Sequence, residues 1–136
     1  MVIGRSGVSF ASAPRRLRET ESIVNHAFSA VTGCDWDVMI AARLMSRPAA
    51  EAVIRYATEA SLATDVEWPL LLRRLGFSLR YVAADGLTYE TNEVYGSGMN
   101  DAEDADLSAW IFRLELAAEH LRVMRKEVAR TSGEER

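Results

Sequence analysis

Apolar residues recur at helical spacing along most of the chain, and the clearest repeat lies between residues 14 and 32. Leu17, Val24 and Phe28 fall on one face of a helix there. Gly33 follows them and can take the left-handed conformation that commonly ends a helix. The pattern therefore predicts a first long helix over 14–32.

Three further helices are predicted in the next part of the chain. Asp35 can cap a second helix, which must end near Pro48 because proline cannot donate the backbone hydrogen bond that a helix interior needs. A third helix begins at Pro48 and is rich in alanine as far as Ala60. A fourth, short helix is predicted over 66–75, where Gly76 supplies the C-terminal stop.

The spacing changes from helical to an alternation with a period of two after this fourth helix. Residues 77–81 alternate in this way, and an Asp85-Gly86 turn can return the chain to a second alternating run. The pattern predicts an antiparallel β-hairpin over 77–92, with its apolar face packed on the helices. The residues expected to face one another are Phe77, Leu79 and Tyr81 on one strand and Leu87, Tyr89 and Thr91 on the other.

The longest helix is predicted over 103–130. Apolar residues alternate there by four and three, which is typical of a helix that packs along one stripe. At about 1.5 Å per residue the helix would be about 40 Å long, more than the rest of so small a domain is expected to cover. We therefore expect part of the stripe to bind another chain. The residues expected to form this partner-binding surface are Trp110, Leu114, Leu121 and Met124.

These elements predict an α+β fold that is predominantly α, with about five helices, one antiparallel β-hairpin and a long C-terminal helix. The length of 136 residues fits one domain, expected over 13–130. A flexible or partner-ordered arm is expected over 1–12 and a frayed tail over 131–136. The predicted core consists of Leu17, Val24, Phe28, Val31, Met39, Ile40, Leu44, Val53, Ile54, Leu71, Leu75, Phe77, Leu79, Leu87, Leu114 and Leu121.

Charge and cysteine content narrow the classes of function. Twenty acidic residues outweigh sixteen basic ones and leave a net charge of −4, which argues against indiscriminate binding to nucleic acid or to an anionic membrane. Apolar runs are too short to span a bilayer, so no membrane partner is expected. The single cysteine, Cys34, rules out an intramolecular disulfide, and the start of the chain lacks the apolar segment of a secretory signal. We expect a cytoplasmic protein.

No pattern in the chain predicts a metal, a cofactor or a catalytic residue. Cys34, His26 and His120 have no paired ligand spacing, so a zinc site is not expected. Asp35 lies next to Cys34 and disfavours a reactive thiolate, which makes a small structural cysteine the better interpretation. The Gly96-Ser97-Gly98 segment leads into four carboxylates and matches neither the dinucleotide nor the P-loop spacing.

Splitting the charge along the chain leaves a local basic site possible. Residues 1–18 carry +4, whereas residues 81–110 carry −7. The predicted order of elements also admits a winged-helix arrangement, with 66–75 as the recognition helix and the hairpin as the wing. Acidic residues on that wing would repel phosphate. The arginines that suit DNA contact in this arrangement are Arg73, Arg74 and Arg80.

The preferred function is a non-enzymatic cytoplasmic protein-interaction or adaptor subunit that uses its long C-terminal amphipathic helix for dimerisation or for binding a different chain. The alternative is a winged-helix-like DNA-binding regulator, or a DNA-processing accessory protein, that uses the three arginines named above. An enzyme with an unrecognised pocket is a third hypothesis.

Overall fold

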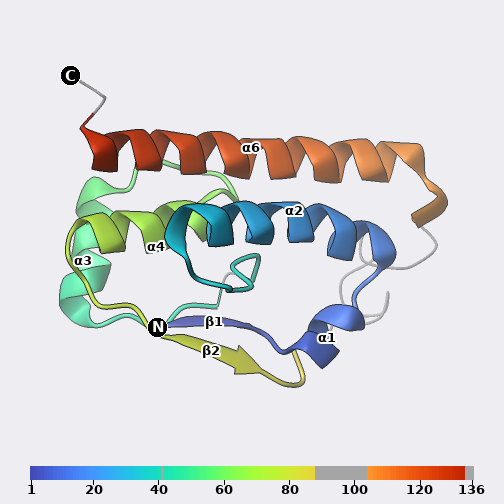
Figure 1. The fold of residues 1–136 in the computed structure, drawn as a ribbon, viewed down its shortest axis with the longest axis horizontal. Coiled ribbons are helices and arrows are strands. Elements are labelled where there is room, and N and C mark those ends of the chain that lie inside the picture. The colour runs from blue at the N-terminus through green and yellow to red at the C-terminus, as the bar shows by residue number, and fades with distance from the viewer. Residues whose placement is uncertain (41, 88–103, 134–136) are drawn as a thin grey trace.

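The computed structural model describes residues 1–40, 42–87 and 104–133, and in these residues the protein is mostly helical (Figure 1). Five α-helices and two short strands make up the described part of the chain. In chain order they are β1 (Val2–Arg5), α1 (Gly7–Ala11), α2 (Arg15–Thr32), α3 (Arg47–Tyr56), α4 (Thr64–Arg74), β2 (Tyr81–Ala84) and α6 (Leu107–Ser132).

Three helices form the body of the molecule, and they run in the same direction. Helix α6 packs against both α2 and α4. The last turns of all three line one pocket, so their C-termini lie at the same end of the molecule (Figure 1). Figure 1 shows α6 along one side of the molecule and the two strands along the opposite side, beyond α2. Helix α3 packs on α4.

Local sequence signals explain where the two long helices begin and end. Gly33 has a φ of 70° and donates its N–H to the carbonyl of Ser29, so it closes α2 in the left-handed conformation that glycine adopts without strain. The carboxylate of Asp106 accepts the N–H of Ser108 and caps the start of α6. The predicted helix over 14–32 and the predicted long C-terminal helix are confirmed.

The predicted antiparallel hairpin is wrong, and with it the predicted α+β class. Strand β2 pairs with β1, and the two strands run parallel in a register from Val2 opposite Tyr81 to Arg5 opposite Ala84. Part of the predicted hairpin, residues 88–92, lies outside the described residues. Alternation in residues 77–81 shows which side of the chain is apolar, but it does not identify the partner strand. The fold is therefore mostly helical with one short parallel strand pair.

The second predicted helix is also wrong, because residues 34–40 and 42–46 are not helical. Side chains of α2 and of the segment itself satisfy several of its backbone groups. The amide of Asn25 accepts the N–H of Val38 at 3.0 Å, and the guanidinium of Arg43 donates to the carbonyls of Val38, Ile40 and Ala42. These hydrogen bonds replace those that a helix would have made.

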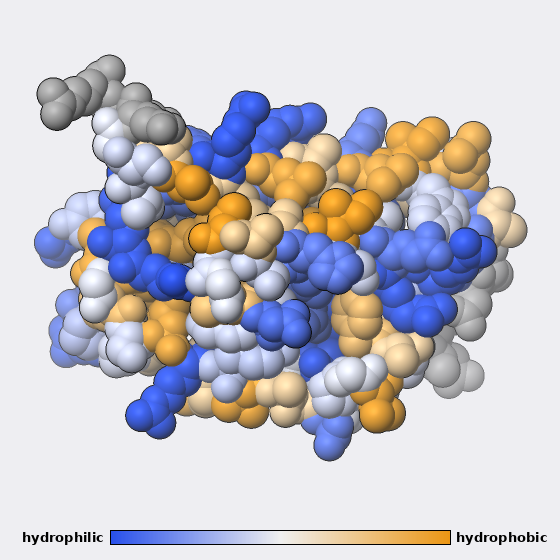
Figure 2. Space-filling view, in the orientation of Figure 1, coloured by the Kyte–Doolittle hydropathy of each residue, from blue (hydrophilic) through white to orange (hydrophobic). Residues whose placement is uncertain are grey.

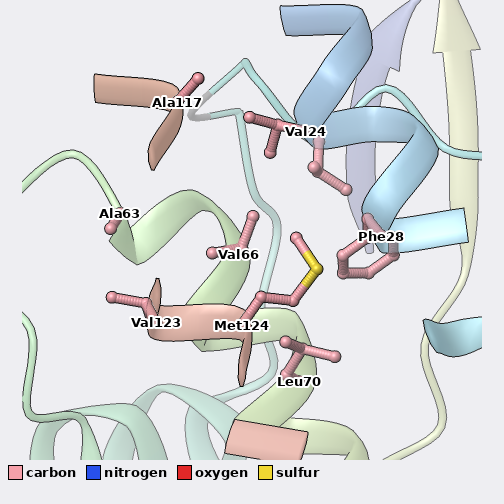
Figure 3. Close-up of a cluster of buried hydrophobic side chains, with 9 residues drawn as sticks. Val24, Phe28, Ala63, Val66, Leu70, Ala117, Val123 and Met124 are labelled. Carbon is pink, nitrogen blue, oxygen red and sulfur yellow. The ribbon is translucent and has the colours of Figure 1, made fainter. Parts of the chain in front are cut away.

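The main core lies between α2, α4 and α6, where Met124 extends from α6 toward Phe28 on α2 (Figure 3). A smaller cluster joins α3 to α4 through Val53 and Leu72. Predicted core residues that the structure buries are Leu17, Val24, Phe28, Val53 and Leu71. Predicted core residues that it exposes are Val31, Leu44, Ile54, Leu75 and Leu114.

The predicted division of the chain at residues 12 and 130 stays a prediction. Within the expected arm, β1 and α1 take up most of the residues, and Val2, Arg5 and Ser9 are buried. Among the described residues, no helix combines the length and the apolar character that crossing a bilayer requires.

Candidate functional site

The side of α6 that faces the protein interior carries ionisable residues at intervals of seven. Arg113, His120 and Glu127 lie on this side together with the buried Leu116 and Val123. Each of these side chains lies next to an acidic or basic partner on α2 or α4. Arg113 contacts Glu21 on α2. On α4, Asp65 lies 4.0 Å from His120, and Arg74 donates to Glu127 at 3.3 Å. The interior face of α6 is thus partly polar.

An apolar stripe lies on the other side of α6, which faces away from the interior. Leu107, Ile111 and Leu114 follow one another at intervals of four and three and are 72%, 48% and 46% exposed. Ala118 and the half-buried Leu121 continue the stripe at the same intervals. We call these five residues the outer seam. Figure 2 shows apolar side chains gathered over the first half of α6, at the upper right of the molecule.

The four residues predicted to bind a partner do not form one surface in the structure. Met124 is only 3% exposed and lies in the main core. Leu121 packs against the edge of that core, whereas Leu114 is exposed. Trp110 is half-buried and its indole Nε1–H donates to the carbonyl of Asp104 at 2.9 Å. Their role in binding stays a prediction, and the outer seam includes two of them, Leu114 and Leu121.

Two of the three arginines predicted to contact DNA make hydrogen bonds within the chain. Arg73 donates to the carbonyl of Thr32 and to Sγ of Cys34, each from Nη1 at 3.2 Å, and so stabilises the negative end of the α2 dipole. Arg74 donates to the buried carboxylate of Glu127. Arg80 is exposed just before β2. A role of these arginines in DNA binding stays a prediction, and the structure gives two of them a local structural role.

The arrangement that would have presented these arginines to DNA is not found within residues 1–40, 42–87 and 104–133. The wing of a winged-helix fold is an antiparallel hairpin, whereas β2 pairs in parallel with β1. The proposed recognition helix, α4, lies against α3 and α6. Its buried residues are Val66, Glu67, Pro69, Leu70, Leu71 and Leu72.

A pocket of about 440 Å³ lies where α2, α4 and α6 end. Arg73 and Arg74 line it, but their charges already meet the carbonyl of Thr32 and the carboxylate of Glu127. Three parallel helices also direct the negative ends of their dipoles toward this end of the molecule. The pocket therefore offers little net attraction to an anionic ligand.

A buried cluster of charged side chains joins β1 to α2, to the segment after α2 and to α6. The guanidinium of Arg5 donates to Asp37 from Nε at 2.7 Å and from Nη2 at 3.0 Å, and to Glu21 from Nη2 at 2.6 Å. Glu21 also accepts from Arg113. Burial raises the pKa of Asp37, but hydrogen bonds from Arg5 and Asn25 outweigh this effect and hold that pKa below its usual value. The cluster pairs its charges and connects elements distant in sequence.

A second buried group consists of Asp65, His120 and Arg43. Burial raises the pKa of Asp65 to about 6, although the nearby charges of Arg43 and His120 act in the opposite direction. His120 is fully buried and its Nδ1 lies 2.7 Å from the carbonyl of Leu116. A carboxylate and an imidazole this close could exchange a proton, but a substrate cannot reach an imidazole with no exposed surface.

Cys34 is half-buried beside Arg73. Within residues 1–40, 42–87 and 104–133, no three side chains of His, Cys, Asp or Glu are grouped so that they could hold a metal ion. Comparison of the chain with models of protein families, with curated proteins and with solved structures found no match. The outer seam of α6 is the candidate functional site.

Part of the apolar stripe of α6 is expected from the sequence to bind another chain, but the four predicted partner-binding residues do not include Leu107 and Ile111. The signal that could have shifted this assignment is the spacing of Arg113, His120 and Glu127, which occupy one face of the helix. Ionisable residues on one face of a helix normally indicate that this face is exposed to solvent. Their spacing alone therefore does not show that this face is buried, because that depends on their partners on other helices.

Proposed function

We propose that this chain is a non-enzymatic cytoplasmic protein-interaction subunit and that α6 binds another protein chain along the outer seam. The observation that carries the proposal is the orientation of α6, whose buried face includes His120 and Glu127 while Leu107, Ile111 and Leu114 are exposed. A contiguous exposed apolar stripe on a helix is typical of a surface that another chain covers.

The spacing of the seam supports a helical partner. Intervals of four, three, four and three, from Leu107 to Leu121, place one apolar side chain on the same side of the helix at every turn. A partner helix could therefore contact the whole seam with side chains of the same periodicity. The single cysteine, Cys34, is in keeping with the reducing cytoplasm.

Site-specific photo-crosslinking in living cells tests the proposal. The photoreactive residue p-benzoylphenylalanine is introduced at Leu114, on the seam, and in a separate control at Tyr56, which is 49% exposed at the end of α3. We expect irradiation to link the chain to another protein chain from position 114 and not from position 56. Equal crosslinking from both positions, or none from position 114, would contradict the proposal.

A further inference from the structure

The charges beside the outer seam differ between the two halves of α6. Asp106, which caps the helix, and Glu115 are exposed and acidic. Arg122 and Arg125 are exposed and basic, and they lie in the second half. The face of α6 that carries the seam is therefore negative toward its N-terminus and positive toward its C-terminus.

We propose that the partner on the outer seam is a second copy of this chain, with the two α6 helices packed antiparallel. The inference rests on the proposed function, because it names the occupant of the same seam. Reversing the direction of one helix brings Glu115 of one chain beside Arg122 and Arg125 of its partner, and two-fold symmetry repeats the same contacts on the other side.

The charge pattern selects this arrangement over others. In a parallel pair the acidic halves would lie together and the basic halves would lie together, which is unfavourable. A partner helix with charges of one sign would be attracted to one half of α6 and repelled by the other. The reversed copy of α6 places opposite charges together at Glu115 and at Arg122 and Arg125.

The antiparallel pair also covers the apolar residues between Ile111 and Val128, a row in which Arg125 is the basic position. Its two-fold axis passes near Ala118 and Leu121, and Ile111 of one chain approaches Val128 of its partner, which is 37% exposed. From Ile111 to Val128 the helix extends about 26 Å at 1.5 Å per residue, so the contact covers most of α6. A pair of this kind closes on itself, because each chain uses the same surface.

Sedimentation equilibrium of the full chain tests the pairing. We expect a species of twice the 15.1 kDa of one chain at tens of micromolar that dissociates on dilution. Leu114→Glu should give a monomer at the same concentrations. Its matched control is Ile54→Glu, at an apolar residue of α3 that is 85% exposed and lies away from the seam, and this variant should still dimerise. A monomeric parent protein throughout this range would overturn the inference.

Exchanging the charges tests the antiparallel direction. Glu115→Arg and Arg122→Glu should each weaken dimerisation about tenfold, because each creates repulsion at two symmetry-related contacts. The double variant should restore the dissociation constant to within about threefold of the parent value, since its charges are again complementary when reversed. Failure of the double variant to recover would overturn the antiparallel arrangement.

The crosslinking experiment separates this inference from the proposed function. A product of twice the single-chain mass from position 114 supports both. A product with a different protein, together with a monomeric parent chain in sedimentation, supports the proposed function and overturns the second copy as the partner. No product, or a crosslink confined to one chain, overturns both.

Discussion

Gly4 lies where β1 passes closest to the segment after α2. A Cβ atom at this position would come within 2.3 Å of the hydroxyl of Tyr81 and 2.5 Å of the carbonyl oxygen of Asp37. Tyr81 is itself held by stacking on Trp36, with ring centroids 5.5 Å apart. Neither the ring nor the backbone can withdraw freely, so only glycine fits without displacement.

We therefore expect Gly4→Ala to lower the free energy of unfolding by about 1–3 kcal/mol, as overpacking of a filled site does. Urea denaturation measures this change. Gly7→Ala is the control, because a Cβ atom at Gly7 would lie in open space. An equal loss in both variants would show that β1 does not approach Tyr81 as closely as the structure indicates.

The buried position of Asp65 predicts how the stability of the protein depends on pH. Its pKa is raised from 3.8 to about 6, so the folded protein binds this proton more tightly than the unfolded chain does. The contribution of Asp65 to stability is thus most favourable below pH 4 and is lost as the pH rises through 6. At about 1.4 kcal/mol per pKa unit, the loss amounts to roughly 3 kcal/mol at most.

Asp65→Asn removes the titrating group, and urea denaturation from pH 4 to pH 7.5 measures the difference between the two proteins. We expect the parent protein to lose stability relative to the variant across this range. Asp85→Asn, at an exposed residue of the turn after β2, should show no such trend. A constant difference between parent and Asp65→Asn at all pH values would contradict the raised pKa.

At the scale of a single element, α6 shows how a helix can bury ionisable residues and expose apolar ones. Glu127 is 2% exposed yet accepts hydrogen bonds from both Arg74 and Arg130. Buried charges that are paired in this way are tolerated, although each lost partner is costly. The rotation of α6 about its axis is therefore set by polar partners on α2 and α4 as well as by apolar packing.

A matched pair of truncations on this helix tests its rotation. Leu116→Ala should lower the free energy of unfolding by about 2–5 kcal/mol, because Leu116 is 9% exposed and its removal leaves a cavity. Leu114→Ala should cost less than about 1 kcal/mol, because its side chain is 46% exposed. Urea denaturation at low protein concentration keeps self-association out of the measurement. The reverse order of the two costs would show that the seam faces inward.

At the scale of the whole molecule, buried charge connects parts of the chain that are far apart in sequence. Arg5 links β1 to Glu21 on α2 and to Asp37, and Glu21 in turn links α2 to Arg113 on α6. Because these residues span most of the chain, the cluster can form only when the strand pair and the helices are assembled together. It couples the N-terminal strand to the helical body.

Arg5→Met should therefore destabilise the whole fold. Removing the guanidinium leaves the carboxylates of Glu21 and Asp37 buried with fewer compensating charges, a change that typically costs about 3–5 kcal/mol. Urea denaturation followed by circular dichroism measures the loss, which should affect all helical signal in one transition. Arg47→Met, which removes an exposed ion pair to Glu51, should change stability little. A small effect of Arg5→Met would show that the cluster is not essential to the fold.

Local sequence determined where the two longest helices, α2 and α6, lie. Helical spacing and glycines such as Gly33 act through neighbours a few residues away, so they could be recognised without the fold, whereas α6 begins after Asp106 and not at the predicted residue 103. The segment after Asp35 shows the limit of this reasoning, since its apolar spacing suited a helix but the side chains of Asn25, on α2, and Arg43, within the segment, make hydrogen bonds to its backbone. The seam residues were visible as apolar positions, and Leu114 and Leu121 were predicted to bind another chain, but the stripe that they share with Leu107 and Ile111 was not identified.

Only the tertiary structure decided which strand pairs with β2 and which side of α6 faces inward. Both depend on partners distant in the chain, Val2 for Tyr81 in the sheet and Glu21 for Arg113 in the interior. A pattern of apolar and polar residues shows that a helix or strand has two different sides. It does not show which side is buried when the polar side finds buried groups of opposite charge, because that outcome depends on charge pairing across the assembled molecule.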